Sequence, residues 1–279
     1  MENKTKIIIG SGKVANIIKN TGDMVLPSSF IDVRNVTSVS AALSKYPPNT
    51  VVVNTAAKIN LEWCEMHRGE SKDVNVNGAV NVAKVCAEHR LHLVHISSGC
   101  IFDGMETEYE YDETDVPSPA SWYAHCKAEA DKKILSVGYD KITIVRPRQL
   151  ISPVPNPTNM LTKFLSIKSG NFIDSKNSVT CIEDMKEAID HLIDKKAYGV
   201  YNVANTGTIS PYLIADLLRR YVDNSMQVNK VSYEDYVKTL NVKRVNTILK
   251  LDKLISTGYV PRSASDAVTW CIHNYGEKS

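Results

Sequence analysis

Short runs of Ile and Val that alternate with helix-forming segments are the feature that most limits how this chain can fold. The runs lie at 6–9, 24–26, 51–57, 91–96 and 141–145. A run this short and this apolar is typical of a parallel strand that is buried on both faces. Apolar residues with helical spacing lie between the strands, most clearly over 75–88 and 121–135. This repetition predicts an α/β chain with a doubly wound parallel sheet, in which ligands bind at the carboxyl ends of the strands.

A proline-rich stretch at 151–157 divides the chain into two parts, and we expect it to be a loop. We predict a dinucleotide-binding Rossmann domain over residues 1–150, with 178–205 returning to it through an amphipathic helix and a further strand. The remaining segments, 151–177 and 206–279, are expected to form a smaller substrate-binding lobe. In that lobe we predict a helix at 158–168 and another that is capped by Ser210-Pro211.

Composition excludes several classes of protein. The formal net charge of the 279 residues is only +2, without runs of like charge, which argues against nucleic acid or a membrane surface as the main partner. No apolar stretch approaches the roughly 20 residues that span a bilayer. The first residues lead directly into a strand and lack a signal-peptide pattern. The six cysteines are scattered, without a C-x-x-C motif, so we expect free thiols in a reducing cytoplasm and no metal site.

The first strand runs into a glycine pattern that is typical of a dinucleotide site. The residues are Gly10-Ser-Gly12-Lys13-Val14-Ala15, which give G-x-G-x-x-A between a strand and a helix. Gly10 permits a tight turn, Gly12 lets the backbone approach a pyrophosphate, and Ala15 allows close packing of the helix. The pyrophosphate would lie at the start of that helix, so we expect Gly10, Gly12, Lys13 and Val14 to contact a cofactor.

The residues after the second strand indicate which dinucleotide binds. An acidic residue at the strand end usually binds the 2′-hydroxyl of NAD, but here the strand ends in Pro27-Ser28-Ser29. Ser28, Ser29 and Arg34 could instead bind a 2′-phosphate, which favours NADPH. Asp32 lies close by, so NADH stays possible, and we place Val33 in the same part of the cofactor site.

A tyrosine and a lysine four residues apart, Tyr123 and Lys127, lie on one face of the helix expected at 121–135. A lysine ammonium under a phenol lowers the pKa of the tyrosine, which suits a general acid near neutral pH. Such pairs are common on solvated helices, so the pair needs a cofactor site and a hydroxyl group nearby. Ser98 follows the strand at 91–96 and supplies that hydroxyl. We therefore expect Ser98 and Tyr123 to converge on one carbonyl group.

Further candidates follow other strands and helices. Small residues end the strand at 51–57, so a cofactor could pass over Asn54, Ala56 and Ala57. Lys163 points away from the apolar face of the helix at 158–168, either into solvent or, as a base, toward the cleft. Arg244, next to Lys243 and before Asn246, could clamp a diphosphate or belong to an ordinary charged surface.

Several motifs together resemble the extended short-chain dehydrogenase/reductase family, in particular its dTDP-4-dehydrorhamnose reductase branch. Within that branch the sequence is similar to the plant-type bifunctional UDP-4-keto-6-deoxy-D-glucose 3,5-epimerase/UDP-4-keto-rhamnose 4-reductase. The similarity covers almost the whole chain, and the glycine loop departs from it by being one residue shorter, with alanine third. The motifs that carry it are Asn54-Thr-Ala-Ala57, Glu62-Trp-Cys-Glu65, Asn75-Val-Asn-Gly78, Ser98-Gly-Cys-Ile-Phe102, Tyr123-x-x-x-Lys127, Asn156-Pro-Thr-Asn-Met-Leu-Thr-Lys163 and the region of Arg244.

The resemblance implies a role for each candidate. Ser98 would polarise a C4 carbonyl, Tyr123 would protonate it, and Lys127 would hold the nicotinamide ribose. The acid/base pair of an epimerase maps onto Cys100 and Lys163, and a cation such as Lys163 would lower the pKa of the thiol. Taken alone, Cys100 would more often be a packing residue. The substrate contacts that the resemblance implies are Lys58, Cys100, Phe102, Asn159, Arg244 and Asn246.

Three functions remain open from the sequence. The first is a bifunctional enzyme that epimerises and reduces a nucleotide-linked 4-keto-6-deoxyhexose with NADPH and yields UDP-L-rhamnose from the UDP sugar; the sequence leaves UDP and dTDP sugars both open as substrates. The second is a monofunctional 4-keto-reductase that depends on a separate epimerase. The third is a catalytically silent NADP-binding subunit that binds a protein partner, which intact Ser98, Tyr123 and Lys127 disfavour. A homodimer is possible by analogy with the fold.

Overall fold

A six-stranded parallel sheet forms the centre of the computed structural model, which describes residues 5–104 and 108–277. The sheet order is β2-β1-β3-β4-β6-β10. The strands are β1 (Lys6–Ile9), β2 (Met24–Leu26), β3 (Val51–Asn54), β4 (His92–Ile96), β6 (Ile142–Pro147) and β10 (Gly199–Val203). The expected doubly wound α/β fold is therefore confirmed. The first residues, expected to lead directly into β1, lie partly outside the described segments.

The strand order positions the ligand site. From β1 the chain goes to β2 on one side and then crosses to β3 on the other, with Ile8 paired to Val25 and to Val53. Connections that leave in opposite directions open a crevice at the carboxyl ends of β1 and β3. The glycine pattern follows β1 at this crevice, so the fold supplies the geometry that the pattern requires.

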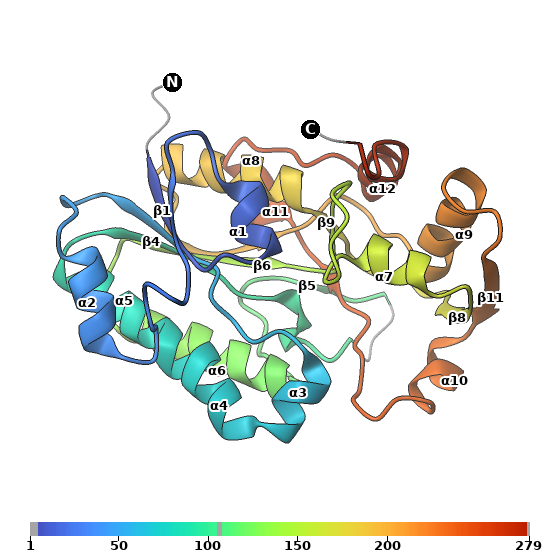
Figure 1. Ribbon diagram of the computed structural model, residues 1–279, viewed down its shortest axis with the longest axis horizontal. Helices are drawn as coiled ribbons and strands as arrows, with labels where there is room; N and C mark the ends of the chain where they lie inside the picture. Colours follow the sequence, from blue (N-terminus) through green and yellow to red (C-terminus); the bar gives the residue numbers. More distant parts are fainter. Residues whose placement is uncertain (1–4, 105–107, 278–279) are drawn as a thin grey trace.

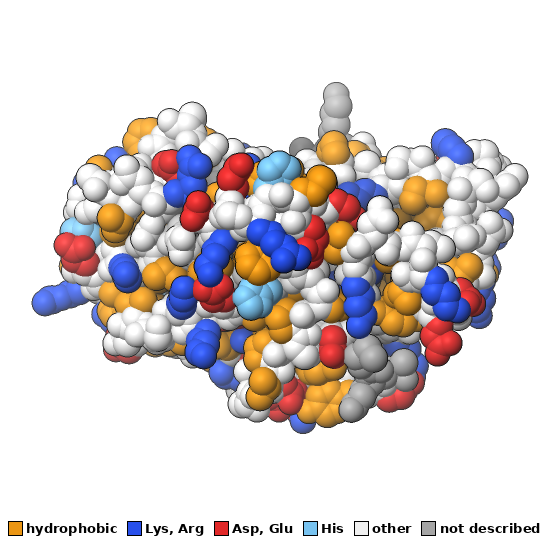
Figure 2. Space-filling view, turned by 90° about the horizontal axis from the view of Figure 1, so that it is seen from below, with side chains coloured by type: hydrophobic (Ala, Val, Ile, Leu, Met, Phe, Trp, Pro, Cys, Tyr) orange, Lys and Arg blue, Asp and Glu red, His pale blue; other side chains and the backbone are white. Residues whose placement is uncertain are grey.

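Helices cover both faces of the sheet (Figure 1). One face carries α2 (Val36–Leu43), α5 (Ala79–Glu88) and α6 (Trp122–Leu135), and the other carries α1 (Lys13–Ile18), α8 (Ile182–Asp194) and α11 (Asp252–Ser256). Each fully buried Ile, Val or Leu in these two layers stabilises the fold by about 1.5–3 kcal/mol relative to exposure. Figure 2 shows the face on the side of α2, α5 and α6, where acidic, basic and hydrophobic side chains are interspersed.

Shorter elements connect the sheet to its surroundings. They are α3 (Leu61–Met66), α4 (Arg68–Lys72), a π-helical segment (Asp73–Gly78), a 3-10 turn (Gly99–Ile101), β5 (Glu110–Tyr111) and β12 (Ile248–Leu249). Strands β5 and β12 pair in parallel, which brings the segment before residue 250 against the loop after β4. None of the helices in the described segments is long and apolar enough to cross a membrane.

The segments after residue 150 that do not return to the sheet build a third core next to it. Its elements are β7 (Leu150–Ile151), α7 (Met160–Ser166), β8 (Ser169–Ile173), β9 (Thr180–Cys181), α9 (Pro211–Tyr221), β11 (Gln227–Val231) and α12 (Ala264–His273). The short helix α10 (Tyr233–Val237) lies against β8 and contributes no buried residue. In α9 the hydroxyl of Ser210 accepts the backbone N–H of Leu213 at 3.2 Å, as the cap motif predicted. In Figure 1 these elements lie at the carboxyl end of the sheet, beyond β6.

Some element boundaries differ from the sequence prediction. The helix expected at 158–168 is α7, which begins only after Asn159, because the side chain of Asn159 caps it by accepting the N–H of Leu161 at 3.3 Å. The helix expected at 75–88 begins with the π-helical segment. The strand expected at 141–145 is β6, which continues to Pro147. Ile151, the first residue of the loop expected at 151–157, lies in β7.

Candidate active site

A cavity of about 1040 Å³ opens along the carboxyl ends of the strands, between the sheet and the elements after residue 150. Its lining comes from the ends of β1, β2, β3, β4 and β6, from the starts of α1 and α6, and from α7. Ligand pockets commonly measure roughly 300–1,000 Å³. This cavity is therefore large enough for more than one small molecule.

The glycine loop forms the part of the cavity next to β1. Gly10 has a φ of +103°, and a Cβ there would approach the Thr55 hydroxyl oxygen to 2.6 Å, so only glycine fits. A Cβ on Gly12 would meet no atom within 4 Å, which leaves the backbone open to a ligand. Lys13 donates its Nζ to the carbonyl of Thr158 at 3.2 Å. Burial, and then the charge of Lys163, lowers the pKa of Lys13 to about 8.

A surface ion pair lies where the second strand meets the cavity. Arg34 donates Nε to Asp32 Oδ1 at 2.9 Å and Nη2 to Asp32 Oδ2 at 2.8 Å. These hydrogen bonds hold the pKa of Asp32 below its ordinary value. Ser28 and Val33 line the cavity beside the pair. Asp32, which could bind a ribose hydroxyl, and Arg34, which could bind a phosphate, are thus paired with each other.

Ser98, Tyr123 and Lys127 line the same part of the cavity. Ser98 ends the loop after β4, and its hydroxyl accepts the N–H of Cys100 at 3.2 Å. Tyr123 is in the first turn of α6, which Ser121 caps, and Lys127 lies one turn later. Lys127 is 3% exposed and donates its Nζ to the carbonyl of Ile96 at 2.9 Å. The cap of α6 and the end of β4 thus bring the predicted trio together.

The electrostatics of this trio differ from the prediction. Burial raises the pKa of Tyr123 well above its ordinary value, and the opposing contributions come from Ser98 and Arg148. Burial also lowers the pKa of Lys127. The pKa of the phenol is therefore raised overall, opposite to the lowering expected from the sequence, because removal of the phenol from water has the largest effect.

Cys100 lies in the 3-10 turn after Ser98 and faces the cavity. Burial raises the pKa of its thiol, while Ser98, Arg148 and Lys127 act in the opposite direction. Lys163 also lines the cavity, but its charge acts on Lys13. The main cations that act on Cys100 are therefore Arg148 and Lys127, in place of the Lys163 that the sequence suggested.

Arg148 was not among the residues predicted from the sequence. It follows Pro147 at the carboxyl end of β6, where the sequence showed only a strand that stops. Its side chain lines the cavity and donates Nη2 to the carbonyl of Val245. The available signal was its position, because the carboxyl ends of strands in such sheets collect ligands.

The other predicted residues fall into two groups. Ala56, Ala57, Lys58 and Arg244 line the cavity, and Arg244 also pairs with Glu62 at 2.5 Å. Ser29, also predicted, is exposed and lies outside the described lining of the cavity. Four further predicted site residues lie outside it as well: Asn54, Phe102, Asn159 and Asn246.

Each of those four is buried and has contacts within the protein. Asn54 Oδ1 accepts the N–H of Ala56 at 3.1 Å. Phe102 stacks on Tyr111 with ring centroids 4.5 Å apart. Asn159 donates to the carbonyls of Ser152 and Val154 at 2.7 and 3.0 Å, in addition to capping α7. Asn246 Oδ1 accepts Asn177 Nδ2 at 2.7 Å. These contacts hold the loops around the cavity and leave the four side chains directed into the protein.

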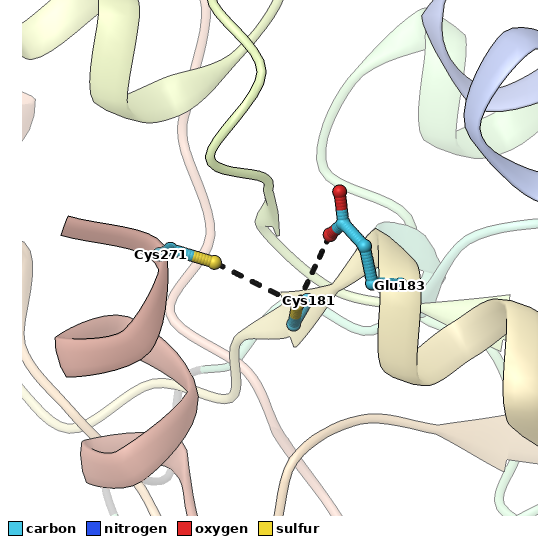
Figure 3. A group of neighbouring side chains, drawn as sticks. All are labelled: Cys181, Glu183 and Cys271. Carbon is cyan, nitrogen blue, oxygen red and sulfur yellow. Dashed lines mark hydrogen bonds between the residues drawn. The ribbon is translucent and has the colours of Figure 1, made fainter. Parts of the chain in front are cut away.

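Cys181, Glu183 and Cys271 form a group of potential metal ligands among the described residues (Figure 3). None of the three lines the cavity. The two sulfur atoms are 3.6 Å apart, and Cys181 donates to Glu183 Oε2 at 3.1 Å. Glu183 Oε1 accepts the hydroxyl of Ser152 at 2.6 Å. A structural zinc site needs four ligands. The described residues supply three potential ligands here. These already form hydrogen bonds with one another, so we describe the group as two neighbouring thiols with a carboxylate acceptor.

Comparisons with known proteins concern almost the entire chain. A family model described as the RmlD substrate binding domain matches residues 11–276. A bifunctional dTDP-4-dehydrorhamnose 3,5-epimerase/dTDP-4-dehydrorhamnose reductase of Arabidopsis thaliana is 27% identical over 226 residues, which cover 78% of this chain and 74% of that protein. The chain spans only 30–32% of three trifunctional Arabidopsis relatives.

Solved structures show the same fold. A dTDP-4-dehydrorhamnose reductase from Bacillus anthracis has a TM-score of 0.86 at 22% identity, covering 98% of each chain. The L780 UDP-rhamnose synthase of Acanthamoeba polyphaga mimivirus has a TM-score of 0.84 at 22% identity, covering 96% of this chain and 99% of that one. At these identities the likeness concerns the architecture.

Proposed function

Because the chain belongs to the family of the RmlD substrate binding domain, we propose that it is an NADPH-dependent reductase of a nucleotide-linked 4-keto-6-deoxyhexose. We propose further that it epimerises C3 and C5 of the same sugar and so yields UDP-L-rhamnose. The observation that carries the proposal is a single cavity onto which the glycine loop, Ser98, Tyr123, Lys127 and Cys100 all open. A dinucleotide and a keto sugar could meet there.

The residues around the glycine loop fit a dinucleotide. The open space in front of Gly12 would admit a pyrophosphate, and Lys13 would add a positive charge beside it. Arg34 and Ser28 would bind a 2′-phosphate, while Asp32 would bind a 2′-hydroxyl if Arg34 turned away. The related Bacillus anthracis reductase was crystallised in complex with NADP, which supports NADPH as the cofactor. When bound, the nicotinamide supplies a hydride to the sugar.

The reduction would use the three residues at the end of β4 and the start of α6. The hydroxyl of Ser98 would donate a hydrogen bond to the C4 carbonyl oxygen, and the phenol of Tyr123 would give its proton to that oxygen. A phenol with an ordinary pKa of about 10 is already protonated at neutral pH, and burial raises the pKa of Tyr123 further, so the residue starts the step as an acid. Lys127, fixed by the carbonyl of Ile96, would orient the ribose next to the phenol. Proton transfer of this kind contributes about 10²- to 10⁴-fold in rate.

The epimerisation would use the same carbonyl. C3 and C5 are both adjacent to C4, so removal of a proton from either leaves its electron pair delocalised onto the C4 oxygen. Ser98 and Tyr123 would stabilise that oxyanion by hydrogen bonds. Cys100 and Lys163 would serve as the acid/base pair that removes a proton from one face and returns one to the other. The mimivirus UDP-rhamnose synthase and the bifunctional Arabidopsis protein support this second activity.

The test is product identification by NMR after incubation with NADPH and either UDP- or dTDP-4-keto-6-deoxyglucose. We expect NADPH oxidation and a rhamnose product with the UDP sugar. Cys100→Ala should still reduce a substrate that has already been epimerised, yet make no rhamnose from 4-keto-6-deoxyglucose. If this variant forms rhamnose at the wild-type rate, the epimerase assignment is wrong. If neither sugar is reduced by the wild type, a silent cofactor-binding subunit becomes the better description.

A further inference from the structure

Arg148 is a charged residue in the cavity whose hydrogen bonds leave part of its guanidinium unused. Its backbone N–H donates to the hydroxyl of Thr180 at 2.9 Å, which fixes the main chain just after β6. Nη2 donates to the carbonyl of Val245 on the opposite wall. Nε is buried and has no hydrogen-bond partner among the described residues. A guanidinium keeps its positive charge in any protein environment, so a fixed charge lies in this wall of the cavity.

The neighbours of Arg148 identify what the charge acts on. Arg148 interacts electrostatically with Cys100, Tyr233 and Tyr123, and among the charged groups around Cys100 its contribution is larger than that of Lys127. Lys127 is held by the carbonyl of Ile96. Cys100 faces the cavity, whereas the other five cysteines of the chain are buried. Arg148 follows the carboxyl end of β6 and Cys100 lies in the turn after β4. These two strands are neighbours in the sheet, and both residues line the cavity there.

We propose that Arg148 is the positioning residue that stabilises the thiolate of Cys100 during epimerisation. This inference deepens the proposed function and rests on it only for the identity of the reaction. When the S–H bond breaks and its proton joins C3 or C5 of the enolate, the electron pair delocalised on the C4 oxygen returns to form the new C–H bond, and the S–H pair stays on sulfur. When the proton returns, the thiolate takes it from carbon and the C–H electron pair moves to the C4 oxygen. One end of each transfer is therefore an anion on sulfur, and a fixed cation beside it favours that state.

Other groups around Cys100 do not replace this role. Ser98 is neutral and shares its hydroxyl with the N–H of Cys100. Tyr123 becomes an anion if it loses its proton, so it would oppose a thiolate. Lys127 is expected to hold the ribose. Lys163, the base that would face the other side of the sugar, interacts with Lys13 across the cavity.

The test is the rate at which iodoacetamide alkylates Cys100, measured between pH 6 and 10 by mass spectrometry of the Cys100 peptide. Neither cofactor nor sugar is needed. In Arg148→Gln the pKa of the thiol should rise by about one unit, so alkylation at pH 8 should fall about tenfold. Arg148→Lys keeps a cation and should stay within about threefold of wild type. Lys163→Gln is the matched control and should leave the alkylation profile unchanged.

The results separate this inference from the proposed function. A folded Arg148→Gln variant with the wild-type alkylation profile overturns the inference. If that variant does not fold, an Arg148→Lys variant that loses tenfold would overturn it alone, because the charge has been kept. If Arg148→Gln slows the alkylation of Cys100 as expected but the wild-type protein makes no rhamnose, only the proposed epimerase function is refuted. Deuterium uptake at C3 and C5 of the keto sugar at the wild-type rate in Arg148→Gln refutes only the role of Arg148.

Discussion

The buried ion pair between α6 and β6 offers a quantitative test of the packing behind the cavity. Arg146 in β6 donates Nε to Asp131 Oδ2 in α6 at 2.9 Å, and the side chains are 5% and 3% exposed. Arg146→Met would leave the carboxylate buried without the cation that it is hydrogen-bonded to, and Lys127 would be the cation that still acts on it. Breaking a buried pair in this way typically lowers the free energy of unfolding by about 3–5 kcal/mol, because the remaining charge is uncompensated.

The pH dependence of that loss follows from the carboxyl group. Burial already raises the pKa of Asp131 above its ordinary value, and Arg146 opposes the rise. Without Arg146 the folded-state pKa rises further, so the folded protein binds a proton that the unfolded chain does not hold near neutral pH. Stability therefore falls as the pH rises from the unfolded pKa toward the folded one. The deficit of Arg146→Met should be smallest at acidic pH and should reach its full size above the folded-state pKa.

Urea unfolding followed by circular dichroism at pH 5 and pH 8 measures both effects. The double variant Arg146→Met/Asp131→Leu is the control, since it removes the orphaned charge and should recover most of the loss. A deficit below about 1 kcal/mol at pH 8, or an equal deficit in the double variant, would refute the reasoning. The first result would mean that water reaches the pair in spite of its burial, and the second that the loss comes from other contacts of Arg146, such as its hydrogen bond to the carbonyl of Glu113.

Three further predictions concern cofactor binding, each measured as a dissociation constant by fluorescence titration. Gly10→Ala should weaken NADPH binding at least about tenfold, because the positive φ and the Thr55 hydroxyl exclude a Cβ; unchanged affinity would mean that the loop shifts freely. Arg34→Ala should weaken NADPH binding about tenfold and leave NADH unaffected or improved, since Asp32 is then released for a ribose hydroxyl; equal loss for both cofactors would exclude a 2′-phosphate contact. Lys13 is charged below its pKa of about 8, so NADPH affinity should decline as the pH rises through 8 to 9. That decline should be absent in Lys13→Met, and its persistence there would assign it to another group.

The fold was predictable from sequence because its signals are local. Each buried strand of the sheet is a short run of apolar residues that can be recognised without its partners. Strands β8 and β11 gave no such signal, since Phe172 is the only buried residue in the two strands, and they pair with each other across more than 50 residues of sequence. Their pairing depends on tertiary contacts, which periodicity does not report.

The candidate site was only partly predictable, for physical reasons that differ between residues. The glycine loop and the Tyr123–Lys127 spacing encode geometry directly, and the structure places both on the cavity. Amide side chains such as Asn54 and Asn159 suit a ligand or a backbone turn equally well, and here they bond to the backbone. The orientation of the Arg148 side chain depends on a hydrogen bond to the carbonyl of Val245, which lies nearly a hundred residues later in the sequence. The pKa of Tyr123 depends mainly on its burial, and the Tyr-x-x-x-Lys spacing gives no information about burial.

The path of the chain through β10 has a consequence for any attempt to divide the protein. After β6 the chain builds β7, α7, β8 and β9 before it returns to place β10 alongside β6, in register from Gly199 to Val203. A fragment cut near residue 150 would present the whole free edge of β6 to other molecules, and such edges promote aggregation. Because the second half supplies β10 to the sheet of the first half, we expect that neither half folds into a soluble protein when it is expressed without the other.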